Sequence, residues 1–374
     1  MLMFIASTVL SACCQSTNLF VGARFLTGLS VASNVLSPAI VGDIYLPEHR
    51  GSAMSLVMLA PLFGGTVGPV AAGAIAESFG WRPVIWLSAA LAIACEVVFL
   101  CCFRETYSVV ILRRRAAALQ CETGNTNFRT KFDIDNDQEA SQDNFWTSIA
   151  RPFRVLYGSY VLQAMSVYGS LTYTYFYIMS TTLPDILEDI YYLSPSSVGL
   201  CFIAFSVGDV IAVVICNRYL DRIYVRLRDK HEGIDQPEYR LPLVIFGSLT
   251  IPIAVAAYGW VPYFQLPLPF MLIACSLLGA TMMFGFLPVT SYVVDALGPY
   301  SASGMTAMIV IRCLAGTFFP LSVEPLVEKI DYGWAFTVLA SISVALAPIP
   351  ILIFRYGHTW RSRSPYMRGS SDSK

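Results

Sequence analysis

The sequence predicts an all-helical protein that crosses a membrane several times, and three observations lead to this fold class. Hydrophobic residues make up 56% of the 374 residues and charged residues only 13%, whereas a typical soluble domain has about 25% charged residues. Mean hydropathy is +0.60. The apolar residues form runs of about 20, the length that a helix needs to cross a bilayer. A formal net charge of −1 predicts no nucleic-acid partner.

Apolar runs divide the chain into about ten candidate membrane spans. They cover roughly residues 1–16, 20–42, 51–76, 82–103, 157–182, 197–217, 242–260, 267–291, 303–325 and 333–354. A long polar loop separates the first four from the last six. The predicted domains are an N-terminal half-bundle (1–103), a cytosolic linker (104–156), a C-terminal half-bundle (157–354) and a tail (355–374).

Lys and Arg are distributed very unevenly among the connections between these spans. One alternating set of connections, which includes the loops 104–156 and 218–241 and the tail, holds most of them. The opposite set holds only Arg82 and Lys329. Cytosolic loops carry the excess of positive charge in membrane proteins. The pattern therefore predicts that the linker and the C-terminus are cytosolic, and we expect the plasma membrane.

An internal repeat relates residues 42–81 to residues 294–334. Aligned in order are Asp43 with Asp295, GTVGP with GTFFP, Glu77 with Glu328, and GW with GW. Both copies lie on the same side of the charge alternation, so the repeat is parallel, as in a large class of secondary transporters. Four spans precede the linker and six follow it, so we expect that two spans are absent before Met1.

The stretch GGTVGPVAAG, residues 64–73, carries more glycine and proline than an ordinary apolar helix. In lipid, small residues let two helices approach closely. The stretch resembles the fifth-span antiporter motif GxxxGPxxGG of the major facilitator superfamily. Gly64, Gly68, Pro69 and Gly73 match the motif, and Ala72 stands where the family has glycine. Packing alone is the alternative explanation for these residues.

Other segments resemble the fungal drug:proton antiporters of the same superfamily. They are RFLTG (24–28), GDIYLPEHRGSAM (42–54), ETYSVVILRRRAAALQCETGN (105–125), PEYRLPL (237–243) and PIPILIFRYG (348–357). The resemblance implies a major facilitator-type bundle of twelve spans in two halves, and it agrees with the repeat that the first two are absent. It also implies proton-driven export of small organic compounds.

Three ionisable residues inside apolar spans are candidates for proton coupling: Arg24, Asp209 and Arg312. A charge inside a bilayer is costly and is a functional hypothesis by default. The resemblance makes Arg24 part of the proton machinery, although a long side chain can also reach the interface. Asp209 either takes up a proton, pairs with a cationic substrate, or is neutralised by a nearby arginine. Arg312 matches a common arginine of the family and either pairs with Asp295 or lines the cavity.

Charged residues at the predicted cytosolic ends of the spans are candidates for a gate between the two halves. They are Asp43 with Arg50, and Asp295 with Asp221 and Arg222. The repeat relation of Asp43 to Asp295 favours a latch of this kind. The alternative is that these charges are simply solvated.

The span 157–182 is the most polar one and is predicted to line a substrate cavity. Lipid offers its hydroxyl and amide groups no partners, so many of them must face protein or water. The candidates are Gln163, Ser166, Tyr168, Ser170, Tyr173 and Tyr177. Most of them recur at three- and four-residue steps on one helix face. A face of aromatic rings and hydroxyls suits amphipathic ligands; hydrogen bonding between helices is the alternative.

The chain is predicted to be a transporter and not an enzyme. Its three histidines are scattered, it has no P-loop, and its ten cysteines show neither disulfide nor zinc spacing. We expect no cofactor and no metal. The predicted function is export of drug-like toxins or secondary metabolites by proton antiport, with a small organic substrate, protons and the lipid bilayer as partners, in a monomer. The alternatives are a non-transporting remnant and a proton-coupled nutrient symporter.

Overall fold

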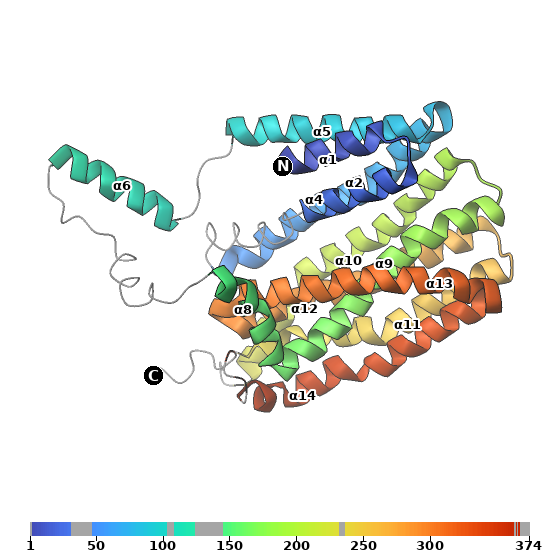
Figure 1. Cartoon of the computed structure of the whole chain (residues 1–374). Coiled ribbons are helices and arrows are strands. Elements are labelled where there is room, and N and C mark those ends of the chain that lie inside the picture. Colours follow the sequence, from blue (N-terminus) through green and yellow to red (C-terminus); the bar gives the residue numbers. More distant parts are fainter. Residues whose placement is uncertain are drawn as a thin grey trace. The chain divides into compact units, whose positions relative to one another are not determined.

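A computed structural model describes most of the chain as helices (Figure 1). The described residues are 2–30, 47–102, 108–123, 145–231, 236–362, 364 and 366. Within these ranges every regular element is an α-helix or a short 3-10 helix. The chain divides into two compact units, Met1–Met54 with Arg82–Arg151, and Ser55–Trp81 with Pro152–Lys374.

The first unit contains a short helical hairpin and two further helices. They are α1 (Leu2–Cys13), α2 (Thr17–Leu29), α5 (Trp81–Cys102) and α6 (Ser108–Thr123). Small side chains line the face where α1 and α2 meet, and the Thr27 hydroxyl donates to Ser7 Oγ at 3.1 Å. The guanidinium of Arg82 reaches the Cys14 carbonyl at 3.5 Å, which ties the start of α5 to the turn after α1.

The second unit holds the larger bundle and the last part of α4 (Pro47–Phe79), which belongs to this unit from residue 55. Its other elements are α8 (Phe145–Tyr157, from residue 152), α9 (Tyr160–Asp189), α10 (Pro195–Lys230), η1 (Pro237–Arg240), α11 (Pro242–Tyr263), α12 (Leu268–Leu297), η2 (Gly298–Tyr300), α13 (Ser301–Leu346) and α14 (Pro348–Ser362). Helices α9 to α13 lie side by side (Figure 1).

Five helical stretches among the described residues are long and apolar enough to cross a membrane. They are Trp81–Cys102, Pro195–Lys230, Pro242–Tyr263, Leu268–Leu297 and Ser301–Ser362. The last stretch contains both of the final predicted spans. They are separated by a bend in α13 at Asp331, where φ is 61° and ψ is 165°. The polar helix α9 is not among the five, which agrees with the hydroxyl groups along its length.

Besides two smaller clusters of buried side chains, the core of the second unit contains one large cluster from α9 to α13. A few polar bonds cross it and fix the helices in register. The Tyr175 hydroxyl donates to the Leu339 carbonyl at 2.9 Å, and the hydroxyls of Thr182 and Tyr258 lie 3.1 Å apart. Buried polar groups in lipid need such internal partners, so these bonds tie α9 to α13 and α11.

Candidate functional site

The glycine-rich end of α4 packs against the start of α10 with the two backbones in contact. A Cβ atom on Gly73 would lie 2.4 Å from the carbonyl oxygen of Pro195, and one on Gly199 would lie 2.4 Å from the carbonyl oxygen of Pro69. The two contacts are one helical turn apart on each helix. In one the glycine belongs to α4, and in the other it belongs to α10. Only glycine permits this approach, because any side chain at either position would overlap the partner backbone.

One further contact joins the same two helices where α10 begins. The carboxylate of Glu77 accepts a hydrogen bond at 3.0 Å from the backbone N–H of Ser196. The first N–H groups of a helix have no partner within the helix, and a carboxylate there is also favoured by the helix dipole. The hydroxyl and the N–H of Ser196 lower the pKa of Glu77 below its ordinary value.

The antiporter motif therefore divides into two parts in the structure. Pro69 and Gly73 contact α10 as described, whereas a Cβ on Gly64 or Gly68 would meet no described atom within 4 Å. The interpretation of the motif as a helix contact thus applies to its second half. The sequence did not identify Gly199 as the partner, although its setting, SSVGLC, is rich in small residues.

An aromatic cluster lies on the predicted substrate face of α9. The Tyr173 ring centroid is 4.9 Å from that of Phe286 on α12 and 5.6 Å from that of Tyr177. Phe176 is 5.8 Å from Tyr173 and 5.7 Å from Phe205 on α10. Rings at these distances attract one another edge to face or offset. Three helices thus contribute to one aromatic surface, of which sequence reasoning found only Tyr173 and Tyr177.

Arg312 on α13 lies directly against this aromatic surface. Its guanidinium carbon is 4.3 Å from the Tyr173 ring centroid and 5.6 Å from that of Phe286. The residue is only 8% exposed, and its Nε has no hydrogen-bond partner among the described residues. The expected alternatives were an ion pair with Asp295 or a place along the cavity. The structure places Arg312 on the rings, and Asp295 bonds to Arg240 instead.

Asp209 is buried where α10 and α12 cross. It is 4% exposed, and a Cβ on Gly279 would lie 3.0 Å from its Oδ1. That oxygen has no hydrogen-bond partner among the described residues, and no ion pair within the described ranges involves it. Of the alternatives for Asp209, neutralisation by a nearby arginine thus finds no such ion pair among the described residues.

The other polar candidates on α9 differ in whether their side chains have a hydrogen-bond partner. The Gln163 amide donates to the carbonyls of Leu156 and Tyr157, at 3.1 Å and 3.3 Å, and so closes the end of α8. Ser166, Tyr168 and Ser170 are buried. Their hydroxyl oxygens have no hydrogen-bond partner among the described residues. Gln163 is thus bonded to the backbone at the end of α8.

Two ionisable residues of the first unit lie within its apolar helices. Arg24 is exposed on α2, with its guanidinium carbon 5.3 Å from the Phe20 ring centroid. Glu96 lies within α5, and its Oε2 is buried without a hydrogen-bond partner in the described part of the chain. Sequence reasoning missed Glu96. A single carboxylate in the apolar run LAIACEVVFL is the signal that points to it.

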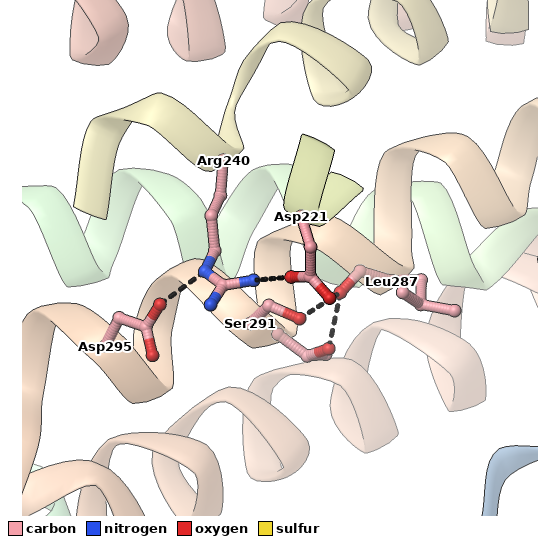
Figure 2. Close-up of polar contacts among 6 residues, drawn as sticks. Asp221, Arg240, Leu287, Ser291 and Asp295 are labelled. Carbon is pink, nitrogen blue, oxygen red and sulfur yellow. Dashed lines mark hydrogen bonds and ion pairs between the residues drawn. The ribbon is translucent and has the colours of Figure 1, made fainter. Parts of the chain in front are cut away.

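The predicted gate residues Asp221 and Asp295 come together through an arginine that the sequence analysis did not select (Figure 2). Arg240 in η1 donates to Asp221 Oδ1 at 3.3 Å and, from its Nε, to Asp295 Oδ2. Its guanidinium carbon also lies 5.0 Å from the Tyr224 ring centroid. The cation that joins the two carboxylates is thus Arg240 rather than Arg222.

The first half of the predicted gate lies beyond what the structure describes. Asp43 falls outside the described residues, and the side chain of Arg50 does too.

Comparison with known proteins assigns the bundle and its motif to one family. The family model described as Major Facilitator Superfamily matches residues 1–320. The chain belongs to the major facilitator superfamily. The resemblance inferred from the motifs is confirmed, and so is the all-helical, multi-pass fold class. Members of this superfamily are membrane transporters.

Curated fungal members of the superfamily resemble the chain over almost all of its length. The efflux pump radE of Floropilus chiversii is 35% identical over 362 residues, which cover 96% of this chain and 67% of that protein. The MFS-type transporter tndD of Aspergillus flavipes is 34% identical over 366 residues, with the same two shares. The chain thus spans about two thirds of the length of these relatives.

Solved structures of the superfamily share the fold. The human organic anion transporter MFSD10 superposes with a TM-score of 0.64 at 19% identity, covering 93% of this chain and 75% of that one. The proton:xylose symporter XylE bound to 6-bromo-6-deoxy-D-glucose gives a TM-score of 0.64 at 19% identity, covering 95% and 78%. At this identity the likeness concerns the fold alone.

Proposed function

We propose that this major facilitator protein exports small organic compounds, such as secondary metabolites or drug-like toxins, in exchange for protons. The observation that carries the proposal is the backbone contact of Pro69 and Gly73 with α10. It gives the antiporter-type motif a structural role, because it fixes α4 against the helix that carries Asp209. The fungal relative radE, which is named an efflux pump, supports the direction of transport.

The proposed transport cycle uses alternating access, in which the two halves of the bundle rock around a site near the middle of the membrane. The aromatic surface around Tyr173 receives the substrate. Proton coupling is assigned to the ionisable groups within the apolar helices: Arg24, Asp209 and Arg312 from the sequence, and Glu96 from the structure. Asp209 is the leading proton carrier because it is buried without an ion-pair partner among the described residues.

The proposed gate at the predicted cytosolic end is the bridge from Arg240 to Asp221 and Asp295. Three charges at the junction of α10, η1 and α12 hold this end together while they are paired. Breaking the bridge releases three strongly hydrated groups, which favours an end that is open to water. Arg222, Asp43 and Arg50 remain candidates for the same gate.

Proteoliposomes with an imposed pH gradient test the proposed function. The full chain is reconstituted, the interior is made acidic, and three probes of matched shape are supplied: 2-naphthoate, its neutral methyl ester and 2-naphthylmethylammonium. Antiport predicts saturable uptake of at least one probe, accompanied by loss of protons from the interior. Protein-free vesicles give the passive component of each flux.

The result also separates the proposed function from the two alternatives. A symporter would not accumulate a probe in the acidic interior, and vesicles loaded with the probe would release it together with protons. A non-transporting remnant would give no flux above the protein-free vesicles with any probe, and either result would overturn the antiport proposal.

A further inference from the structure

Arg312 is a buried cation that forms no ion pair with any carboxylate among the described residues. The residue is 8% exposed, and no ion pair among the described residues involves it. Its Nε is buried without an acceptor among those residues. Burying a charged group without hydrogen-bond partners is unfavourable. An arginine held in this state indicates that something else supplies the missing acceptor.

The rings beside Arg312 fix its position without using its N–H groups. Its guanidinium carbon lies 4.3 Å from the Tyr173 centroid and 5.6 Å from the Phe286 centroid. A cation–π contact of this kind attracts the charge to the ring system and does not use the Nε–H, which has no acceptor among the described residues. A guanidinium presents these donors as a planar fork that matches a carboxylate in two parallel hydrogen bonds.

The aromatic residues around the guanidinium determine the shape of the compound that fits there. Tyr173, Tyr177 and Phe286 lie with centroids 4.9 Å and 5.6 Å apart. Gly316, one turn after Arg312 on α13, leaves room for the Tyr177 ring, which a Cβ at that position would approach to 2.6 Å. Flat faces beside a buried cation favour a ligand that is itself flat and negatively charged.

We propose that Arg312, with Tyr173, Tyr177 and Phe286, recognises planar aromatic acids, in which a carboxylate or similar anionic group bonds to the guanidinium while the ring system packs on the aromatic side chains. The inference rests on the proposed function, because it assigns a substrate class to the same aromatic surface. It replaces the earlier assignment of Arg312 to proton coupling by a role in binding.

Asp209 is the residue that would favour a cationic ligand instead of an anionic one. It is also buried, and its Oδ1 also has no hydrogen-bond partner among the described residues. A carboxylate can become neutral by binding a proton, whereas a guanidinium stays charged at all physiological pH values. The permanent charge in the site is therefore positive, and the anion is the favoured ligand.

Equilibrium binding to the full chain in nanodiscs tests the substrate class. The probes are 2-naphthoate, its methyl ester and 2-naphthylmethylammonium, with the free concentration of each measured by dialysis against the nanodiscs. The three share one ring system and differ in charge. We expect 2-naphthoate to bind about tenfold or more tightly than the ester, because the charge-assisted bonds to Arg312 are lost in the ester.

Two variants assign the preference to the residue. Arg312→Gln is expected to bring the ratio of acid to ester affinity to about one, and Arg312→Lys to retain part of it, since an ammonium keeps the charge but not the fork. Arg355→Gln is the matched control, because Arg355 also lies over a tyrosine ring, 5.8 Å from the Tyr356 centroid, but is exposed on α14. It should leave the ratio unchanged.

Equal affinity for acid and ester in the unmodified protein would overturn the inference, even if every variant failed to fold. So would a preference for the ammonium probe that disappears in Asp209→Asn, or no saturable binding of any probe. Binding with the expected preference but without proton-driven flux would overturn the proposed function and leave this inference standing. Proton-driven flux of the ester without a binding preference for the acid would overturn this inference and leave the proposed function standing.

Discussion

Gly73 of α4 and Pro195 of α10 are in backbone contact, with the position of a Cβ on Gly73 only 2.4 Å from the Pro195 carbonyl oxygen. The reciprocal contact between Gly199 and Pro69 is equally close. Two helices that meet at two glycines, one turn apart, can form weak Cα–H···O bonds along the contact. The contact therefore depends on the absence of side chains rather than on any particular one.

Gly73→Ala should separate α4 from α10 and destabilise the protein. Its methyl group would overlap the backbone of Pro195, which cannot rotate away, and overpacking of this kind costs about 1–3 kcal/mol. Thermal unfolding in detergent measures the loss. Gly68→Ala is the matched control, because its methyl group would meet no described atom within 4 Å. An equal effect of both substitutions would show that the α10 contact is not the cause.

Glu77→Gln should lower stability near neutral pH and have little effect in acid. The bonds from Ser196 lower the pKa of Glu77 in the folded protein, so its carboxylate contributes stability above its unfolded pKa, and this contribution is lost as pH falls through the folded value. Melting temperatures of both proteins from pH 7 to pH 3 should converge. Glu328→Gln, at the aligned position of the repeat, is the control, and a constant difference across the range would contradict the prediction.

Replacing Arg240 should loosen the end of the second unit where α10 and α12 meet. Arg240→Ala leaves Asp221 and Asp295 close together without their shared cation. The two carboxylates are 54% and 37% exposed, so water screens them and the loss is on the order of 1 kcal/mol. Arg240→Lys should recover only part of it, because one ammonium cannot fork to both carboxylates.

The salt dependence of unfolding distinguishes this loss from a packing defect. The difference between the unmodified protein and Arg240→Ala should shrink at high ionic strength. If the bridge also serves as the gate, Arg240→Ala should change the rate of proton-driven flux while leaving probe affinity intact. Flux at the unmodified rate would remove the bridge from the transport cycle.

Asp209→Asn should abolish proton coupling but not the binding of a neutral probe. Asparagine has nearly the same shape, so the crossing beside Gly279 is preserved, but it cannot bind and release a proton. Proton efflux from acidic vesicles is recorded for the unmodified protein and for Asp209→Asn, during uptake of the methyl ester and of the ammonium probe. No change in the transport of either probe would exclude Asp209 from both coupling and charge recognition.

Arg24→Ala tests the second coupling candidate, which lies in the first unit. Its cation is exposed on an apolar helix, where a charge is retained only for a function or by reaching the membrane interface. We expect gradient-driven export to be lost while the protein still reaches the membrane, as measured by surface labelling. Export at the unmodified rate would favour the interfacial explanation.

The sequence predicted most of the fold because lipid imposes simple rules on length and polarity. Apolar runs located α5 and α10 to α12, and hydroxyl groups singled out α9. The periodicity of α9 selected Tyr173 and Tyr177, but periodicity describes one helix and cannot show that Phe286 faces it from α12. Arg240 was missed for a similar reason, since it lies in the predicted loop 218–241, where many charges are simply solvated. Only the fold shows that it meets two carboxylates.

Arg312 also has a consequence for the energy source of the transport cycle. A guanidinium cannot lose its charge, so the empty site carries one positive charge when Asp209 holds its proton. The site filled by a monovalent anion carries one negative charge when Asp209 is ionised. Movement of either form through the electric field of the membrane is then a voltage-dependent step, at about 2.3 kcal/mol per 100 mV for a full crossing. The membrane potential would thus act on both the loaded and the returning carrier, and the pH gradient on the proton of Asp209.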